Sequence, residues 1–377
     1  MKIAHLVGHS ALNGVATSTK MLIDAQIRAG HEVMLVYPRD SWIGRQTFAG
    51  PLKKMESSFK TTPAELRKTG YPIRDWGRAL VHAHGNRANK LAMIYTIVDG
   101  TPAVMTAHAR RFQIPWRFAH AVVGLSRPTA DYYTSRFLVS RSRMHVVPNM
   151  FDLHGVQPVT AEARAAARRK LGIRDDTLLL GAVGKIDARK NQVDALLALK
   201  RLLTIEHDAE LLLIGDASEG DELPGWREAL ADPALAGRVH LAGHREDAVS
   251  LISAMDIFLC VSRVEEAPIA PLEAMAQAVP VISTDVGNMS DLLPDERLFP
   301  VGEVDGMAKA VDRLCGETTS LGEAGAADRR MVAAKLSPEA ILPRIEAIYR
   351  AALGRARDRG WKHFANPDDR WTPSQRA

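Results

Sequence analysis

Short apolar runs alternate with longer amphipathic stretches along most of the chain. Helical periodicity is clearest at 15–29 and 86–98. Continuous apolar runs, in place of strict alternation, are typical of parallel strands that helices cover on both faces. The pattern therefore predicts βαβ units and a doubly wound α/β sheet. The strands expected in the first half are 3–7, 32–36, 80–83, 103–107, 121–125 and 145–147.

The second half of the chain repeats this rhythm, with a helical pattern after each apolar run. Between the halves, Pro148-Asn149 and a polar stretch precede an Ala/Arg-rich helix at 161–171, which predicts a linker near 150–160. We therefore expect two Rossmann-like domains, 1–155 and 156–345, that face each other across a cleft. The strands expected in the second domain are 178–183, 210–214, 239–242, 257–261 and 279–283.

The end of the chain has a different pattern. Residues 338–355 predict a long helix, and the following residues become polar, with Trp361 and Trp371 among them. Residues 346–377 are expected to form a helix and tail that cross back to the first domain. The alternative is a frayed end.

Charge separates the halves more clearly than hydropathy does. The 377 residues carry 49 Lys and Arg against 44 Asp and Glu, a formal +5. Residues 1–150 hold 21 basic and 8 acidic side chains, or +13, whereas the remainder holds 28 and 36, or −8. Such asymmetry favours an anionic partner for the first half.

Three observations favour a cytoplasmic protein. No apolar run approaches the roughly 18 residues of a membrane-spanning helix. Histidines interrupt the first apolar run, which is typical of a strand and not of a signal peptide. The two cysteines, Cys260 and Cys315, form no disulfide framework and are expected to be ordinary thiols in a reducing compartment.

Several common site motifs are missing. The loop at 8–14 is not G-x-G-x-x-G, no phosphate-binding G-x-x-x-x-G-K-[ST] occurs, and Gly124-Leu125-Ser126-Arg127-Pro128 lacks the last glycine of a nucleophile elbow. His82-x-His84 is a weak metal signal, and buried or strand-end histidines are the preferred interpretation. No two aspartates are separated by one residue, so no Asp-x-Asp metal clamp is present. A bound diphosphate would need another source of positive charge.

A basic turn after the strand at 178–183 can provide that charge. It runs from Gly184 and Lys185 to Lys190. Ligands of open α/β sheets bind at the carboxyl ends of such strands, and lysine binds phosphate as a point charge. The alternative is a solvated charged loop.

A second loop follows the strand at 257–261 and opens a helix at 268–271. Free N–H groups at a helix start bind anions. Glu265 precedes this helix and Glu273 lies just beyond its first turn. Two carboxylates beside an anion site are unfavourable unless they accept hydrogen bonds from hydroxyl groups, such as those of a sugar and a ribose. The alternative for Glu273 is a position on the helix surface.

The motif of Glu265, seven residues, then Glu273 in Glu-Ala-Met-Ala resembles the signature of the retaining glycosyltransferases of family 4, which have the GT-B fold. Other segments match in the same order, over nearly the whole chain and most specifically over 178–290. These are Asn13-Gly14-Val15 (the glycine loop), 81–85, Thr106-Ala107-His108 (the histidine of the cleft), 147–149, Gly184-Lys185 to Lys190 (the phosphate turn), 213–216, 241–245 and 283–287.

The resemblance implies a nucleotide-diphosphate sugar as donor, held mainly by the second domain, and transfer of a hexose-type sugar with retention. It implies no metal and no other cofactor. His108, Glu265 and Lys190 would take part in catalysis. The implied donor-binding set is Gly14 at the diphosphate, Lys185 and Lys190 on its charge, the backbone of Ile269, Ala270 and Pro271 on phosphate oxygens, Glu273 on the ribose, Glu265 on a sugar hydroxyl, and the backbone at His244 on the base.

Three departures from the family pattern leave the donor base and sugar open. Lys185 replaces the usual arginine and so removes a bidentate fork. Pro268 replaces a glycine and has no N–H to donate. Asn13 replaces a second glycine in the first loop.

Other functions of the same fold are weighed against this one. A nucleotide-sugar epimerase or a phosphorylase would need a further water-activating carboxylate or a cofactor-binding lysine, and neither is recognised. A non-catalytic nucleotide-sugar-binding scaffold is the main alternative. Nucleic-acid binding is suggested only by basic charge, without a recognisable module.

The basic first half is expected to bind the acceptor, a glycan or glycolipid of lipopolysaccharide or surface polysaccharide synthesis. Arg110 and Arg111 follow His108 closely and are the candidate acceptor-binding residues. Our hypothesis is that this half rests on the anionic inner face of the cytoplasmic membrane or grips an anionic glycolipid. The alternative is a solvated basic face. The sequence leaves the oligomeric state open.

Overall fold

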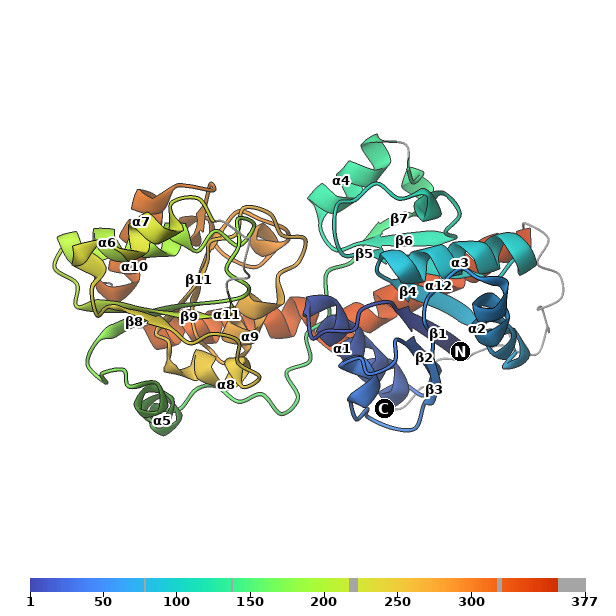
Figure 1. Cartoon of the computed structure of the whole chain (residues 1–377), viewed down its shortest axis with the longest axis horizontal. Helices are drawn as coiled ribbons and strands as arrows, with labels where there is room; N and C mark the ends of the chain where they lie inside the picture. The colour runs from blue at the N-terminus through green and yellow to red at the C-terminus, as the bar shows by residue number, and fades with distance from the viewer. Residues whose placement is uncertain (78, 137, 217–222, 317–320, 359–377) are drawn as a thin grey trace. The chain divides into compact units, whose positions relative to one another are not determined.

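The computed structural model describes residues 1–77, 79–136, 138–216, 223–316 and 321–358. The chain divides into two compact units, Met1–Met150 with Pro338–Ala377, and Phe151–Ser337. Each unit has its own parallel β-sheet with helices on it (Figure 1). The change from one unit to the other therefore falls at 150/151 and 337/338, where the sequence suggested 155/156 and 345/346. One reason is that Phe151 already donates its N–H to the carbonyl of Leu336 at 2.8 Å.

The first unit contains a seven-stranded parallel sheet in the order β3-β2-β1-β4-β5-β6-β7. All six strands predicted in this half are present. The seventh, β3, was missed because its sequence Lys-Lys-Met-Glu is charged and mostly exposed, as edge strands often are. The strands are β1 (Lys2–Val7), β2 (Glu32–Tyr37), β3 (Lys53–Glu56), β4 (Leu80–His84), β5 (Ala103–Ala107), β6 (Ala121–Gly124) and β7 (Met144–Val146).

Helices cover this sheet on both faces, which explains why β1, β4 and β5 are buried almost throughout. The last described helix, α12, contacts α1, β5 and β6 and so belongs to the first unit, as predicted for the chain end. The tail with Trp361 and Trp371 lies outside the described residues. The helices of this unit are α1 (Gly14–Arg28), α2 (Pro63–Asp75), α3 (Asn86–Asp99), α4 (Arg127–Ser135) and α12 (Pro338–Asp358).

The second unit contains a six-stranded parallel sheet in the order β10-β9-β8-β11-β12-β13. The five predicted strands are present, and the sixth, β13, is only two residues long, too short to give a hydrophobic pattern. The strands are β8 (Leu178–Val183), β9 (Ala209–Ile214), β10 (Val239–Leu241), β11 (Ile257–Cys260), β12 (Val281–Thr284) and β13 (Leu298–Phe299).

The helices of the second unit enclose an aliphatic core of leucine, alanine, isoleucine and valine side chains. Helix α5 occupies the residues predicted for it. None of the described helices in either unit is long and apolar enough to cross a membrane. The helices of this unit are α5 (Ala161–Leu171), α6 (Val193–Thr204), α7 (Trp226–Leu230), α8 (Ala248–Leu251), α9 (Ile269–Ala276), α10 (Val304–Gly316) and α11 (Leu321–Leu336).

Candidate functional site

The basic turn after β8 is shaped around Lys190. Gly184 has φ +145°, and a Cβ there would lie 3.1 Å from Cε of Lys190, so a side chain at position 184 would be strained and would crowd the lysine. The side-chain carboxylate of Asp187 accepts a hydrogen bond from the N–H of Lys190 at 2.8 Å. The backbone carbonyl of Asp187 accepts one from the N–H of Asn191 at 2.9 Å. These bonds fix the turn and hold the stem of Lys190 against Gly184.

Lys190 reaches Glu265, which lies in the loop after β11. The ammonium is 2.7 Å from Oε1 of Glu265, and the guanidinium of Arg189 donates to the same oxygen at 2.5 Å. Ser262 Oγ adds a hydrogen bond at 3.3 Å. One carboxylate therefore faces two cations, and the group keeps a net positive charge. The sequence assigned Lys190 and Glu265 to one donor site, and in the structure the two side chains are in contact.

Glu273, on α9, lies close enough to Lys190 for an electrostatic interaction between the two side chains. Burial raises the pKa of Glu273 to about 7, and the positive charge of Lys190 partly opposes that rise. Its carboxyl group is therefore ready to exchange a proton near neutral pH. In either state its oxygens can accept hydrogen bonds from hydroxyl groups. Glu273 is half-buried, so it is not a fully solvated position on the helix surface.

The start of α9 offers fewer backbone donors than the sequence suggested. Pro268 is the N-cap, and its side chain makes no capping bond. Pro271 was expected among the phosphate-binding backbone groups, but proline has no N–H. The N–H groups of Ile269 and Ala270 remain, and first-turn N–H groups have no partner inside their own helix. Two amides, not three, are therefore available to an anion here.

Neighbouring strand ends complete this edge of the sheet. His244, after β10, donates its N–H to Oδ1 of Asp216 at 2.7 Å, and Asp216 accepts the N–H of Ile186 at 2.9 Å. The carbonyl of Lys185 accepts from Gln192 Nε2 at 2.9 Å. The loops that carry Lys185 and His244 are thus tied to each other through Asp216.

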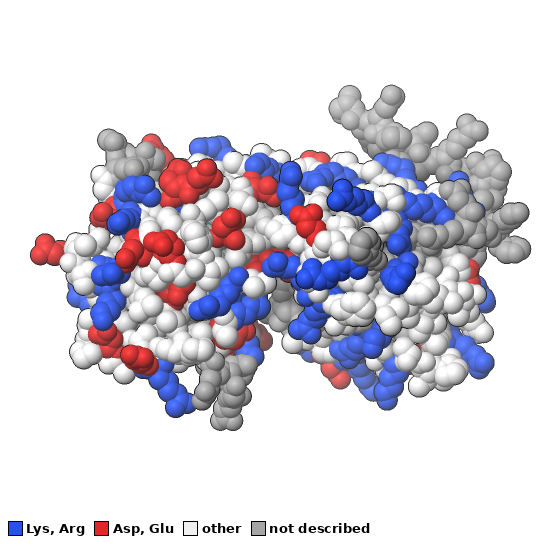
Figure 2. Space-filling view, turned by 90° about the horizontal axis from the view of Figure 1, so that it is seen from above, with Lys and Arg blue, Asp and Glu red and all other residues white. Residues whose placement is uncertain are grey.

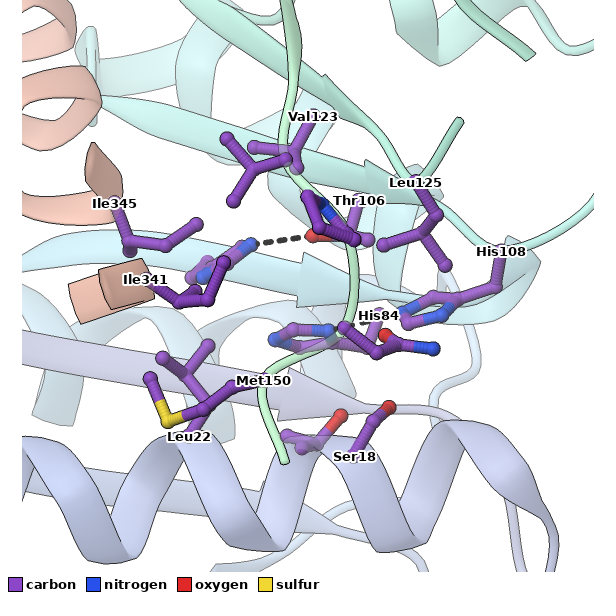
Figure 3. A pocket seen from close by; sticks show the side chains of 15 residues that line it. Ser18, Leu22, His84, Thr106, His108, Val123, Leu125, Met150, Ile341 and Ile345 are labelled. Carbon is purple, nitrogen blue, oxygen red and sulfur yellow. Dashed lines mark hydrogen bonds between the residues drawn. The ribbon is translucent and has the colours of Figure 1, made fainter. Parts of the chain in front are cut away.

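The first unit places His108 just after β5, beside a pocket with about 360 Å³ of empty space that includes open solvent (Figure 3). His84 Nδ1 lies 3.2 Å from His108 Nε2, and His82 Nε2 lies 2.7 Å from Thr106 Oγ1. His82 and His84 are buried, as their sequence context suggested. The pocket is lined by Ser18, Thr19, Leu22, His82, His84, Thr106, His108, Val123, Leu125, Val147, Pro148, Asn149, Met150, Ile341 and Ile345.

Burial determines the charge of these histidines. It lowers the pKa of His5, on β1, to about 4 and that of His108 to about 3. The pKa values of His82 and His84 are also lowered by burial, with smaller contributions from neighbouring histidines. All four rings are therefore neutral at pH 7, and each has one nitrogen that donates and one that accepts.

The remaining predicted residues of the first unit lie at the start of α1 and in the loop after β5. Gly14 is the first residue of α1, and the side chain of Asn13 accepts the N–H of Ala16 at 3.0 Å, so Asn13 serves as the N-cap. Arg110 and Arg111 lie in the loop after His108. Tyr133 Oη accepts the N–H of Arg111 at 3.0 Å and fixes that loop.

Sequence reasoning missed five residues of these sites. Nothing in the sequence links Arg189 to Glu265, which lies 76 positions away. The histidine cluster could have been suspected, because histidines occur within two of the predicted buried strands. No sequence signal indicates its partners on helices, Gln26 and Tyr349. The missed residues are His5, Gln26, Thr106, Arg189 and Tyr349.

Two family models match the chain. Residues 12–154 match the one described as Glycosyltransferase Family 4, and residues 177–317 match the one described as Glycosyl transferases group 1. Together they cover more than half of the chain.

Two curated relatives are similar at 29% identity. One is a GDP-mannose-dependent monoacylated alpha-(1-6)-phosphatidylinositol monomannoside mannosyltransferase of Corynebacterium glutamicum, over 54% of this chain and 55% of the relative. The other is the lipopolysaccharide core biosynthesis mannosyltransferase LpsB of Rhizobium meliloti, over 50% and 54%. The matches thus span about half the length of these two relatives.

Solved structures show the same fold at lower identity. The chain of Anabaena Alr3699/HepE in complex with UDP and glucose superimposes with a TM-score of 0.80 at 18% identity, over 93% of this chain and 100% of that one. The fold is that of the GT-B glycosyltransferases. The chain therefore belongs to the glycosyltransferases that join a family 4 domain to a group 1 domain.

Proposed function

We propose that the protein is a retaining, metal-independent glycosyltransferase that moves a hexose-type sugar from a nucleotide-diphosphate sugar to a glycan or glycolipid acceptor. The acceptor would belong to lipopolysaccharide or surface polysaccharide synthesis, as with the relative from Rhizobium meliloti, whose name places it in lipopolysaccharide core synthesis. The observation that carries this proposal is the grouping of Lys190, Glu265 and Glu273 at one strand edge of the second unit.

This grouping suits a sugar attached to a diphosphate. Lys190 has three donors, so it can keep one bond to Glu265 while another reaches a phosphate oxygen. The N–H groups of Ile269 and Ala270 supply further donors for that phosphate. Glu273 and Glu265 offer acceptors for ribose and sugar hydroxyl groups. The positive charge comes from side chains, so the proposal needs no metal ion.

In the proposed reaction, the bond between the anomeric carbon and the phosphate oxygen breaks on the face where the acceptor oxygen attacks. The new glycosidic bond forms on that same face, and the acceptor hydroxyl proton passes to the departing phosphate oxygen. No covalent sugar–enzyme bond is needed. The work of Lys190 and the α9 amides is to stabilise the negative charge that develops on the diphosphate, as an oxyanion hole does.

A donor panel tests this function. UDP-, GDP- and ADP-sugars are incubated with the protein and an anionic glycolipid acceptor, with and without EDTA. We expect one donor to release its nucleoside diphosphate at the same rate in both conditions, and the anomeric proton coupling of the product to match that of the donor. Inversion would overturn the mechanism. Nucleotide binding without transfer or donor hydrolysis would favour the scaffold alternative.

We further propose that the first unit contacts an anionic membrane surface through the loop after β5. Phe112 is 70% exposed and Ile114 is 59% exposed, and both follow Arg110 and Arg111. Lys and Arg also predominate in the half of the view in Figure 2 that holds this unit. Exposed apolar side chains next to basic ones are suited to a surface with apolar depth and negative charge.

Vesicle sedimentation tests the membrane contact. The double variant Phe112→Ser/Ile114→Ser should weaken binding to vesicles with anionic lipid by about tenfold or more, since full burial of one such apolar side chain contributes about 1.5–3 kcal/mol. Ile205→Ser, at a 51% exposed position of the second unit, is the matched control and should change nothing. Equal binding of the wild type to anionic and neutral vesicles would contradict the proposal.

A further inference from the structure

A chain of hydrogen-bonded side chains leads from the interior of the first unit to His108. Gln26 Oε1 lies 2.7 Å from His5 Nε2, and His5 Nδ1 lies 3.1 Å from His84 Nε2. His84 Nδ1 in turn lies 3.2 Å from His108 Nε2. Gln26, His5 and His84 are at most 2% exposed, whereas His108 is partly exposed and lines the pocket (Figure 3). The chain therefore has a buried end and an end at the pocket.

A second branch starts from the same glutamine. Gln26 Nε2 donates to Tyr349 Oη, on α12, at 2.9 Å, and Tyr349 Oη lies 2.7 Å from His82 Nδ1. His82 Nε2 then lies 2.7 Å from Thr106 Oγ1, which also lines the pocket. A single buried amide thus joins two branches, and both end at the pocket.

The glutamine sets the direction of the bonds. Its Oε1 can only accept, so neutral His5 carries its proton on Nε2, and Nδ1 of His5 accepts from Nε2–H of His84. Nδ1 of His84 must then accept from Nε2–H of His108. Nδ1 of His108 is left without a proton, and it has no hydrogen-bond partner among the described residues. Turning the amide over would reverse every bond in both branches.

A metal ion would use the same cluster in a different way. Ring nitrogens of His5, His82 and His84 lie within 4.8 Å of one another. All six ring nitrogens of these three residues are already in hydrogen bonds. An ion bound to one nitrogen of each ring would have to break at least two of these hydrogen bonds in a buried site, where each unpaired group costs about 1–3 kcal/mol. The contacts therefore favour hydrogen-bonded histidines, each with its proton on a defined nitrogen, over a bound metal ion.

We propose that Gln26, His5 and His84 are positioning residues that hold the ring proton of His108 on Nε2, so that Nδ1 accepts a hydrogen bond from a hydroxyl group of a ligand in the pocket. Burial supports the neutral rings that this order requires. The use of that hydroxyl in sugar transfer rests on the proposed function. The order of the protons does not depend on it.

The test is the tautomer of His108 in the full-length protein. Protonated and bare ring nitrogens have well-separated ¹⁵N shifts, so ring-¹⁵N histidine labelling reads the tautomer directly, and His108→Gln identifies the signals. We expect Nε2–H in the wild type. His5→Phe does not touch His108, yet it removes the acceptor of His84 and should move the proton of His108 partly or wholly to Nδ1.

Two further variants act as controls for this test. His5→Asn keeps an acceptor near the place of Nδ1 and should restore the wild-type tautomer. His120→Phe removes another buried histidine of the same unit, 1% exposed and outside both branches, and should leave His108 unchanged. If His5→Phe does not fold, Gln26→Leu removes the anchor instead and should also release the proton.

Three results would overturn the proposal. They are a wild-type His108 protonated on Nδ1, an unchanged tautomer in a folded His5→Phe or Gln26→Leu variant, and stoichiometric displacement of the ring signals by Zn²⁺. Donor turnover is measured on the same variants, where we expect kcat to fall about tenfold, the effect of one hydrogen bond, with little change in donor KM. If the tautomer shifts but the wild type turns over no donor, the proposed function fails while the proton order stands.

Discussion

The most deeply buried titratable groups differ in kind between the two units. The first buries neutral side chains that share protons along hydrogen bonds, as in His5, His82 and His84. The second buries charges in pairs. Arg297 donates to both carboxylate oxygens of Asp328 at 2.7 and 2.6 Å, at positions that are 6% and 2% exposed.

This difference assigns different sensitivities to the two halves. A buried ion pair balances a large desolvation cost against a close attraction, so removing one partner leaves an uncompensated charge. A neutral network has less to lose from a single deletion, but its protons can be rearranged and its rings can be charged by acid. The second unit is therefore suited to hold a charged ligand, and the first to present a hydroxyl-binding ring in a set protonation state.

The largest expected effect is on the buried pair of the second unit. Arg297→Leu should lower the free energy of unfolding by about 3–5 kcal/mol, because Asp328 stays buried without its partner. Denaturant unfolding measures this. Arg297→Leu/Asp328→Leu should recover most of the loss, and Arg201→Ala, which breaks the exposed pair with Asp305, should cost at most about 1 kcal/mol. A similar loss in all three would contradict the contrast between buried and surface charges.

Next in size is the effect of Lys190 on turnover. Lys190→Ala should lower kcat for donor turnover about 10²–10³-fold, as the loss of one donor to a developing anion does. The fold should persist, because Arg189 still pairs with Glu265. Lys200→Ala, which breaks an exposed pair with Asp232, is the matched control and should keep full activity. Near-normal turnover by Lys190→Ala would contradict the proposal that Lys190 stabilises the departing diphosphate.

Acid should affect the two units with opposite sign. The folded pKa of His5, about 4, lies below its unfolded value near 6.5, so its contribution to stability is complete above pH 6.5 and is lost as pH falls toward 4. The folded pKa of Glu273, about 7, lies above its unfolded value near 4.5, so its contribution is complete below pH 4.5 and is lost as pH rises toward 7.

Hydrogen exchange read by mass spectrometry can separate these two effects in the full chain, after correction for the pH dependence of intrinsic exchange. From pH 7 to 5, core peptides of the first unit should lose protection, with a slope that approaches about 1.4 kcal/mol per pH unit below pH 6.5 for each histidine that is charged only on unfolding. The second unit should keep or gain protection over this range, because Glu273 binds a proton more readily in the folded state. Parallel loss in both units would contradict the contrast. Replacement of His5 by Phe should reduce the slope for the first unit.

The smallest effect compares one helix cap in each unit. Asn13 caps α1, and Thr160 caps α5 by accepting the N–H of Ala163 at 3.2 Å. Asn13→Ala and Thr160→Ala should each cost about 1 kcal/mol in thermal unfolding, whereas Asn13→Gly should cost only a few tenths. If Asn13→Gly also changed donor KM, position 13 would act on the ligand as well as on the helix.

Much of the fold could be predicted because most strands of both sheets contain continuous apolar runs. The exceptions have physical reasons, since β3 is charged on an exposed edge and β13 has only two residues. The grouping of Lys190 with Glu265 could be predicted because both follow parallel strands of one sheet. The roles of Gln26 and Tyr349 could not, because a polar residue in a helix does not reveal which buried ring it meets, 21 and 267 residues away in the chain.

Hydrogen exchange with and without a nucleoside diphosphate tests most directly whether the second unit holds the donor. UDP, GDP and ADP are each added to the full chain in the presence of EDTA. We expect one of them to protect peptides that cover 184–191 and 265–273, and this protection to disappear in Lys190→Ala. Protection confined to peptides of the first unit, or the same protection in Lys190→Ala, would contradict the assignment of the diphosphate to Lys190 and the start of α9.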